Sequence, residues 1–133
     1  MNPVFLDTVG LLAVWNEDDQ WHGAASTAFT AVKRERATLF TTTFVLAECA
    51  NATAWSAFRE SVVDLRTLLG SYRGLIHPTG ADFETAWERS KSGFPGAPGL
   101  VDELSFSVMR RLGLRRAFTN DRHFADAGFA VLF

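Results

Sequence analysis

Short apolar runs alternate along the chain with longer stretches in which apolar residues recur every three or four positions. Runs such as Val4-Phe5-Leu6 are typical of strands buried on both faces, and the longer stretches indicate helices with one buried face. The predicted strands are 4–6, 39–42, 75–77, 116–119 and 129–132. Five helices are predicted at 8–15, 56–71, 81–90, 100–112 and 121–127. A further helix is predicted with Asp18 or Asp19 as its cap and an apolar stripe from Trp21 to Val32. Another begins at a cap formed by Thr42 or Thr43 and ends near Trp55. Their inward faces are expected to include Leu68, Trp87 and Leu112.

This alternation predicts an α/β fold with a parallel sheet covered by helices on both faces. Sheets of that kind bind ligands beyond the carboxyl ends of their strands. The one irregular stretch, 93–99, is rich in Gly and Pro and is too short for an interdomain linker, so we predict a loop.

The composition fits one domain spanning residues 1–133, of which 47% are hydrophobic. The single cysteine, Cys49, excludes an internal disulfide and fits a reducing compartment. No apolar run approaches the roughly 20 residues of a membrane helix. The first ten residues lack the pattern of a secretory signal. We therefore expect a cytoplasmic protein without a membrane partner.

The net charge of −2 is unusual for a domain whose main task is to grip phosphates. A nucleic-acid role would need local basic patches or metal ions. Two patches occur, around residues 33–36 and 110–116, and each taken alone fits a solvated helix end.

Four carboxylates stand where a purely structural explanation is strained when they are taken together. Asp7 and Asp121 each follow a predicted parallel strand, so they should emerge at the same edge of the sheet. Asp102 begins the helix 100–112, and Glu48 lies in an otherwise apolar helical run. Each has an ordinary alternative: a helix cap for Asp7 and Asp121, a dipole-complementing acid for Asp102, and a solvent-edge residue for Glu48.

Carboxylates that converge in one cleft repel one another unless a cation neutralises them. Oxygen ligands without histidine or thiolate partners suit Mg²⁺ or Mn²⁺ rather than zinc, and such ions polarise a phosphoryl group and activate water. The pattern therefore predicts metal-dependent hydrolysis of a phosphodiester.

These residues also carry a family resemblance. Asp7-Thr8 after the first strand, Thr42-Thr43-Phe44-Val45-Leu46-Ala47-Glu48, Asp102 through Met109, and Ala117 through Phe124 resemble the PIN domain over nearly the whole chain. The resemblance implies a three-layer α/β/α sandwich with a central, mainly parallel twisted sheet. It also implies a VapC-like toxin of a toxin–antitoxin pair: an Mg²⁺- or Mn²⁺-dependent endoribonuclease, commonly homodimeric and held inactive by a cognate antitoxin protein.

By this resemblance, Asp7, Glu48, Asp102 and Asp121 are the metal-binding and catalytic acids, supported by Thr8 and Thr119. Glu48 would be a ligand or a base that orients water. Two positions depart from the family pattern, because Val9 and Val101 stand where hydroxyl residues are often found. Those departures bear on hydrogen bonds around the site rather than on the carboxylates.

Several other residues receive ordinary interpretations. The four tryptophans (Trp15, Trp21, Trp55 and Trp87) are expected in the core or on a dimer surface, His123 as a packed or surface residue, and Cys49 as an inert hydrophobe. Arg115, Arg116 and Arg122 are nearest in sequence to the site and would steer the RNA backbone.

Three alternatives remain open. A phosphoaspartate receiver or phosphatase is disfavoured because neither Lys33 nor Lys91, the only lysines, is placed for it. A catalytically inactive RNA-binding or interaction module would not need mutually repelling acids. An RNA-processing nuclease outside a toxin–antitoxin pair would share the same chemistry.

Overall fold

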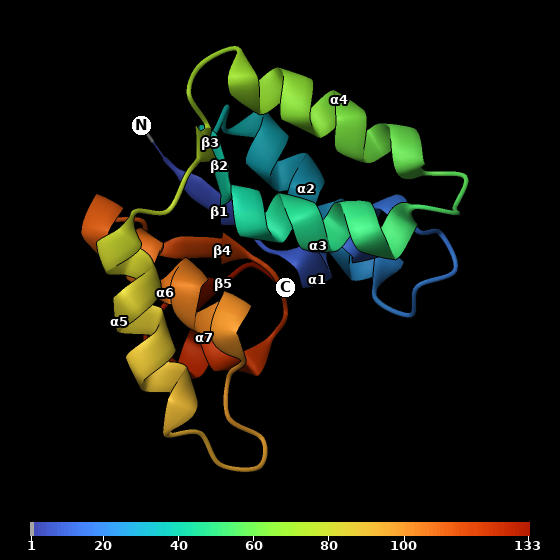
Figure 1. The fold of residues 1–133 in the computed structure, drawn as a ribbon. Coiled ribbons are helices and arrows are strands. Elements are labelled where there is room, and N and C mark those ends of the chain that lie inside the picture. Colours follow the sequence, from blue (N-terminus) through green and yellow to red (C-terminus); the bar gives the residue numbers. More distant parts are fainter. Residues whose placement is uncertain (1) are drawn as a thin grey trace.

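A five-stranded, all-parallel sheet forms the centre of the computed structural model, which describes residues 2–133 (Figure 1). Its strands lie in the order β3 (Leu75–Ile76), β2 (Leu39–Thr42), β1 (Val4–Leu6), β4 (Arg116–Phe118) and β5 (Ala130–Val131). The helices are α1 (Thr8–Trp15), α2 (His22–Arg34), α3 (Thr43–Thr53), α4 (Arg59–Gly70), α5 (Gly80–Lys91), α6 (Leu100–Leu112) and α7 (Arg122–Asp126). In the described chain, no helix is both long and apolar enough to span a bilayer.

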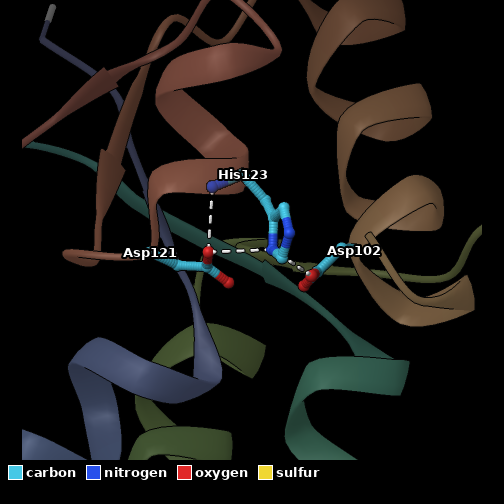
Figure 2. A group of neighbouring side chains, drawn as sticks. All are labelled: Asp102, Asp121 and His123. Atoms are coloured by element: carbon cyan, nitrogen blue, oxygen red, sulfur yellow. Dashed lines mark hydrogen bonds and ion pairs between the residues drawn. The ribbon is translucent and has the colours of Figure 1, made fainter. Parts of the chain in front are cut away.

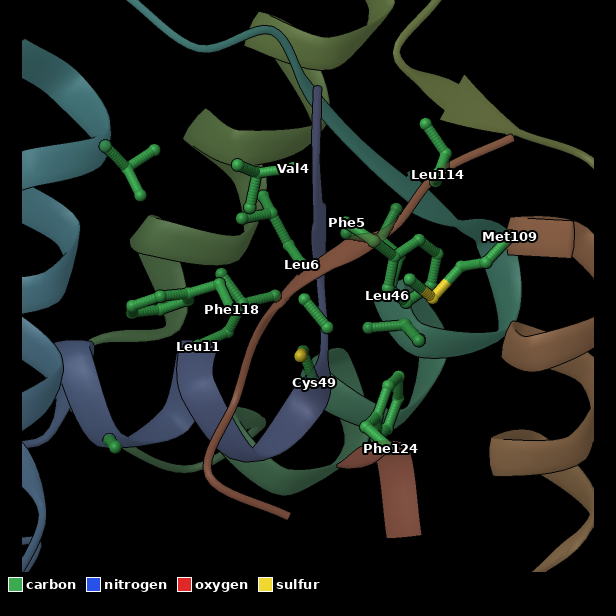
Figure 3. Packing of buried hydrophobic residues seen from close by; sticks show 14 of the residues in the cluster. Val4, Phe5, Leu6, Leu11, Leu46, Cys49, Met109, Leu114, Phe118 and Phe124 are labelled. Carbon is green, nitrogen blue, oxygen red and sulfur yellow. The ribbon is translucent and has the colours of Figure 1, made fainter. Parts of the chain in front are cut away.

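Side chains of the central strand alternate between two helical layers (Figure 3). Val4 and Leu6 point to the same side as Phe118, whereas Phe5 points to the opposite side, toward Met109 and Phe124. On the first side the ring of Phe118 packs 5.2 Å from Phe29 of α2. On the second side, Phe124 of α7 packs edge-on against Phe106 of α6 at 4.9 Å. The predicted α/β class with a parallel sheet is confirmed, and both sheet faces are buried as the apolar strands require.

Several element boundaries agree with the sequence prediction because local signals determine them. The bounds of β1, α1, β2 and α6 are as predicted, and the Thr42 hydroxyl caps α3 by accepting from Val45 N at 3.1 Å. Gly113 ends α6 in the left-handed conformation with φ +70°, which favours glycine. The stretch 93–99 is a loop, as predicted.

The start of α2 is a correction. No side chain caps this helix, which begins at His22. The Asp19 carboxylate instead accepts from Trp21 N at 2.8 Å and closes a turn before the helix. Helix α4 also begins later than predicted, at Arg59, because turns follow the end of α3.

The prediction of inward faces was wrong at three positions. Leu68, Trp87 and Leu112 are 43–49% exposed. Helix α4 lies at the periphery of the fold (Figure 1). Of its residues only Val62 and Leu69 are buried, so the buried face of the helix is narrower than the set of its apolar residues. Of the four tryptophans, Trp15 packs against the core, whereas Trp21, Trp55 and Trp87 lie on the surface.

Gly10 permits a close approach that positions the site. A Cβ atom at this residue of α1 would lie 2.1 Å from the carbonyl oxygen of Phe118, the last residue of β4. Only glycine lets α1 pass this close to the carboxyl end of the neighbouring strand. The two segments that carry Asp7 and Thr119 are thereby brought together.

Candidate metal centre

Asp7 and Asp121 emerge at the same edge of the sheet, as predicted. Leu6 pairs with Phe118 in the parallel ladder, so the residues after β1 and β4 leave the sheet side by side. Thr119 connects the two acids: its hydroxyl donates to Asp7 Oδ2 at 2.8 Å and accepts from Asp121 N at 3.1 Å. This fully buried threonine therefore fixes the relative position of both aspartates.

Asp7 is a carboxyl group buried in the protein, with 3% of its surface exposed. It caps α1, since Oδ2 also accepts from Val9 N at 3.4 Å. Burial raises its pKa from 3.8 to about 7, the Thr119 hydrogen bond opposes that rise, and the charges of Asp102 and Asp121 add to it. The capping of α1 explains why a hydrogen-bond acceptor is needed at Asp7, but the raised pKa shows that a negative charge at this position is unfavourable.

Glu48 approaches from α3. Its Oε1 accepts from the Thr8 hydroxyl at 2.6 Å, which connects α3 to the first residue of α1. Glu48 is exposed, so the solvent-edge interpretation is correct for its accessibility. Its charge nevertheless reaches the cluster, because it raises the pKa of Asp102.

Asp102 in the first turn of α6 faces Asp121 at the start of α7, and His123 lies between them (Figure 2). His123 Nδ1 is 3.1 Å from Asp121 Oδ1 and 3.8 Å from Asp102 Oδ2. Burial and the charge of Asp121 raise the pKa of Asp102 to about 6, while His123 opposes the rise. Asp121 also caps α7 by accepting from His123 N at 2.9 Å.

Both ring nitrogens of His123 face oxygen acceptors. Nε2 lies 2.7 Å from the carbonyl oxygen of Gly96, and Nδ1 faces the Asp121 carboxylate. An imidazole can satisfy two acceptors only when both nitrogens carry protons, so this geometry favours the imidazolium. In agreement, the Gly96 hydrogen bond and the two carboxylates raise the pKa of His123.

The predicted acids thus lie in one region, as a central group with two flanking acids. Asp102, Asp121 and His123 each offer a ligand atom, and these atoms lie within 4.8 Å of one another; within residues 2–133 this is the one group of that kind. Asp7 and Glu48 flank it, coupled to it by charge. Carboxylate oxygens and an imidazole fit a divalent cation, and their mutual repulsion is what such an ion relieves.

His123 is the residue that sequence reasoning missed. It was expected to be a packed or surface histidine, but it is half-buried and joins the acid cluster. The available signal was its spacing: it follows Asp121 by two residues at the start of a short helix, where both side chains face the strand end. Arg115 and Arg116 were wrongly expected near the site, because β4 starts there and its opposite end carries the acids. Arg116 instead pairs with Glu35 at 2.6 Å.

The expectation for Cys49 holds in the structure. Cys49 is buried and its thiol pKa is raised to about 12, chiefly by burial, so it is inert. The effect of Val9 and Val101 on hydrogen bonds around the acids stays a prediction: Val9 is exposed, and Val101 lies half-buried in a hollow that Glu48 also lines.

Comparison with known proteins finds similarity in structure. No family profile matches the sequence, and no curated protein matches it either. The crystal structure of Mycobacterium tuberculosis VapC20, described as a sarcin-ricin loop cleaving toxin, matches with a TM-score of 0.80 and 26% identity, covering 96% of both chains.

Two further structures share the fold at lower identity. FitAcB from Neisseria gonorrhoeae matches with a TM-score of 0.62 and 15% identity over 98% of this chain and 96% of that one. VapBC2 from Rickettsia felis, bound to a DNA fragment from their promoter, matches with a TM-score of 0.64 and 16% identity over 97% and 96%. With its five-stranded parallel sheet and its match to VapC20 over almost the full length, the chain has a PIN-like α/β fold and is similar in structure to VapC toxins.

Proposed function

We propose that this protein is a metal-dependent endoribonuclease that hydrolyses RNA phosphodiester bonds as the toxin of a toxin–antitoxin pair. The observation that carries the proposal is the group of Asp102, Asp121 and His123, with the buried Asp7 beside it, at the carboxyl edge of a parallel sheet. The match to VapC20, which is described as cleaving the sarcin-ricin loop, supports RNA as the substrate.

Asp102, Asp121 and His123 would hold a divalent cation, with Asp7 and Glu48 as further ligands or as acceptors for its waters. Both hydrogen bonds of Asp7 go to Oδ2, so Oδ1 stays available. When bound, the ion would lower the pKa of its water and stabilise charge on the scissile phosphate. Glu48, whose Oε1 accepts from the Thr8 hydroxyl, would accept a proton from the attacking water. In-line attack would leave a 3′-hydroxyl and a 5′-phosphate.

The donor set bears on which ion is preferred. Carboxylates alone suit Mg²⁺, whereas an added imidazole favours transition ions such as Mn²⁺. His123 would donate its Nε2 proton to Gly96 and bind the ion through Nδ1, an orientation common among metal-ligating histidines. We therefore propose Mg²⁺ or Mn²⁺, with Mn²⁺ bound more tightly.

The test is cleavage of a structured RNA that contains a sarcin-ricin loop, with Mn²⁺ present. We expect the wild type to cleave and both Asp7→Asn and Asp102→Asn to lose at least about a hundredfold in rate. Asp64→Asn, an exposed acid on α4, is the matched control and should cleave normally. Equal cleavage by all variants would reveal a contaminating nuclease.

The alternative functions separate on two measurements. Absence of saturable Mn²⁺ binding in calorimetry would favour an inactive RNA-binding module. The expected cognate antitoxin is supported by FitAcB and VapBC2, which are toxin–antitoxin complexes of the same fold. A neighbouring short reading frame whose product binds the protein and suppresses cleavage supports the toxin role, and its absence favours an RNA-processing nuclease. The expected homodimer is tested by analytical ultracentrifugation.

A further inference from the structure

A cavity of about 440 Å³ opens next to the candidate metal centre, between the end of α5, the loop 93–99, α6 and α7. We call it the loop pocket. Its volume lies in the range of about 300–1,000 Å³ typical of small-molecule sites. His123 lines the loop pocket and also belongs to the acid cluster, so a ligand bound there lies beside the metal centre.

Three arginines from three helices line the loop pocket: Arg89 of α5, Arg110 of α6 and Arg122 of α7. Arg110 is held in place, because its Nη2 donates to the Ala127 carbonyl at 3.1 Å and its guanidinium lies over an aromatic ring. The Arg89 carbonyl accepts from Ser92 Oγ at 3.2 Å, but the guanidinium groups of Arg89 and Arg122 make no ion pair or hydrogen bond with any described residue. Guanidinium groups bind phosphates well, and the three arginines outnumber the two acids of the lining, Glu103 and Asp126, so the loop pocket carries an excess of positive charge on a chain of net charge −2.

The loop contributes an aromatic side chain. Phe94 lines the loop pocket while 71% of its surface is exposed, an unfavourable placement for a phenylalanine without a ligand. Two hydrogen bonds hold the loop: Ala97 N donates to the Phe94 carbonyl at 2.9 Å, and the Gly96 carbonyl accepts from His123. An exposed ring held beside arginines is the arrangement on which single-stranded bases stack.

Glu103 of α6 supplies a polar acceptor. It lines the loop pocket, and its Oε2 is buried without a hydrogen-bond partner within the described chain. Buried carboxylate oxygens normally find donors, so this atom is available to accept a hydrogen bond from a donor outside the chain, such as a ligand N–H group. Among the four bases, guanine presents two neighbouring N–H donors on its pairing edge, which match one carboxylate.

We propose that the loop pocket binds one nucleotide of the RNA substrate next to the scissile bond, and that it prefers guanine. The phosphate would contact Arg122 and Arg89, the base would stack on Phe94, and Glu103 would accept from the base edge. This proposal rests on the proposed function for the identity of the polymer, but its binding step needs neither metal nor cleavage.

The first test is binding of 5′-nucleotides to the intact protein in EDTA, followed by NMR. We expect GMP to bind about tenfold more tightly than AMP, CMP or UMP, with shifts at the loop and at α7. Glu103→Gln should bring GMP to the level of AMP. Arg122→Ala should weaken all four nucleotides alike.

The matched controls are Glu60→Gln, a first-turn acid of α4, and Arg34→Ala in the last turn of α2, both expected to bind as the wild type does. Thermal unfolding of each variant separates loss of binding from loss of folding. Equal affinity for the four nucleotides, or shifts confined to another face, would overturn the proposal.

The second test replaces guanines near the cleavage position by adenine in the RNA. Slower cleavage of one such substrate, with the difference lost in Glu103→Gln, supports the guanine preference. Cleavage that depends on Asp7 and Asp102 but ignores these changes rejects the loop pocket and leaves the nuclease proposal standing. Selective GMP binding without any metal-dependent cleavage supports the loop pocket and rejects the nuclease proposal.

Discussion

Replacing Asp7 by asparagine is expected to stabilise the metal-free protein at neutral pH, although the change removes a carboxylate from the candidate metal centre. The reason is the position of Asp7: it is buried and faces the charges of Asp102 and Asp121. Its pKa is therefore raised from 3.8 to about 7. Ionising it at neutral pH works against folding.

The magnitude follows from the size of that rise. Each pKa unit corresponds to about 1.4 kcal/mol, so three units lower the free energy of unfolding by about 4 kcal/mol once the group is ionised. Asparagine keeps the oxygen that accepts from Thr119, but its two buried N–H donors offset about 1–3 kcal/mol of the gain. We expect a net stabilisation of about 2 kcal/mol, which for a chain of this length raises Tm by about 7 °C.

The sign of the pH dependence distinguishes this mechanism from improved packing. A carboxyl whose pKa is higher in the folded state binds its proton more tightly when folded. The wild type should therefore lose stability as pH rises from 3.8 to about 7, with Asp102 contributing in the same direction up to about 6. Near pH 4 the advantage of the asparagine variant should be lost and the order reversed, because the cost of about 1–3 kcal/mol for its buried N–H donors does not depend on pH.

The assay is thermal and urea unfolding followed by circular dichroism in EDTA, at intervals from pH 4 to 8. Asp64→Asn is the matched control, expected to change stability by less than about 0.5 kcal/mol at every pH. Mn²⁺ at a hundred times its Kd should stabilise the wild type by about 2.7 kcal/mol and reverse the order. An asparagine variant less stable than the wild type at pH 7.5, or an effect independent of pH, would refute the reasoning.

Three further outcomes are expected. His123→Gln should weaken Mn²⁺ binding about tenfold or more and Mg²⁺ binding less, as measured by calorimetry; an equal loss for both ions contradicts an imidazole ligand. Thr119→Val removes the hydrogen bond that lowers the pKa of Asp7, so the acidic limb of the cleavage–pH profile should move to higher pH, with activity reduced about 10–100-fold; an unmoved limb contradicts it. Asp82→Ala breaks the ion pair with Arg111 (2.7 Å) between α5 and α6 and should lower the free energy of unfolding by about 2 kcal/mol. Because that pair lowers the pKa of Asp82, the difference should shrink as pH falls below 4, and a constant difference contradicts this account.

Much of the fold could be predicted because its signals are local. A three-residue apolar run, a threonine cap and a glycine stop determine β1, α3 and the end of α6 over a few neighbouring residues. The shared edge of Asp7 and Asp121 could also be predicted, since parallel strands align their carboxyl ends. The extent of burial could not be predicted from sequence periodicity. Leu68 lies on an apolar stripe of α4, but this helix is at the periphery of the fold, and the rest of the protein does not cover the whole stripe.

The role of His123 could not be predicted because it depends on contacts between distant segments. Its ring orientation comes from the Gly96 carbonyl, 27 residues earlier, in a loop whose conformation needs a positive φ at that glycine. No periodic pattern reports such a contact. For the same reason the loop pocket, built from α5, α6, α7 and the loop, appears only once those elements are packed.

Helix capping explains the positions of the acids but not their chemistry. Asp7 caps α1, Asp121 caps α7, and Asp102 lies in the first turn of α6, so each one alone has an adequate structural role. Serine, threonine or asparagine would cap these helices as well, without charge. Carboxylates at all three positions repel one another, which the raised pKa values of Asp7 and Asp102 express. A sequence that retains charges opposing its own folding is best explained by a ligand of opposite charge, because the one described basic side chain between these acids is the imidazole of His123.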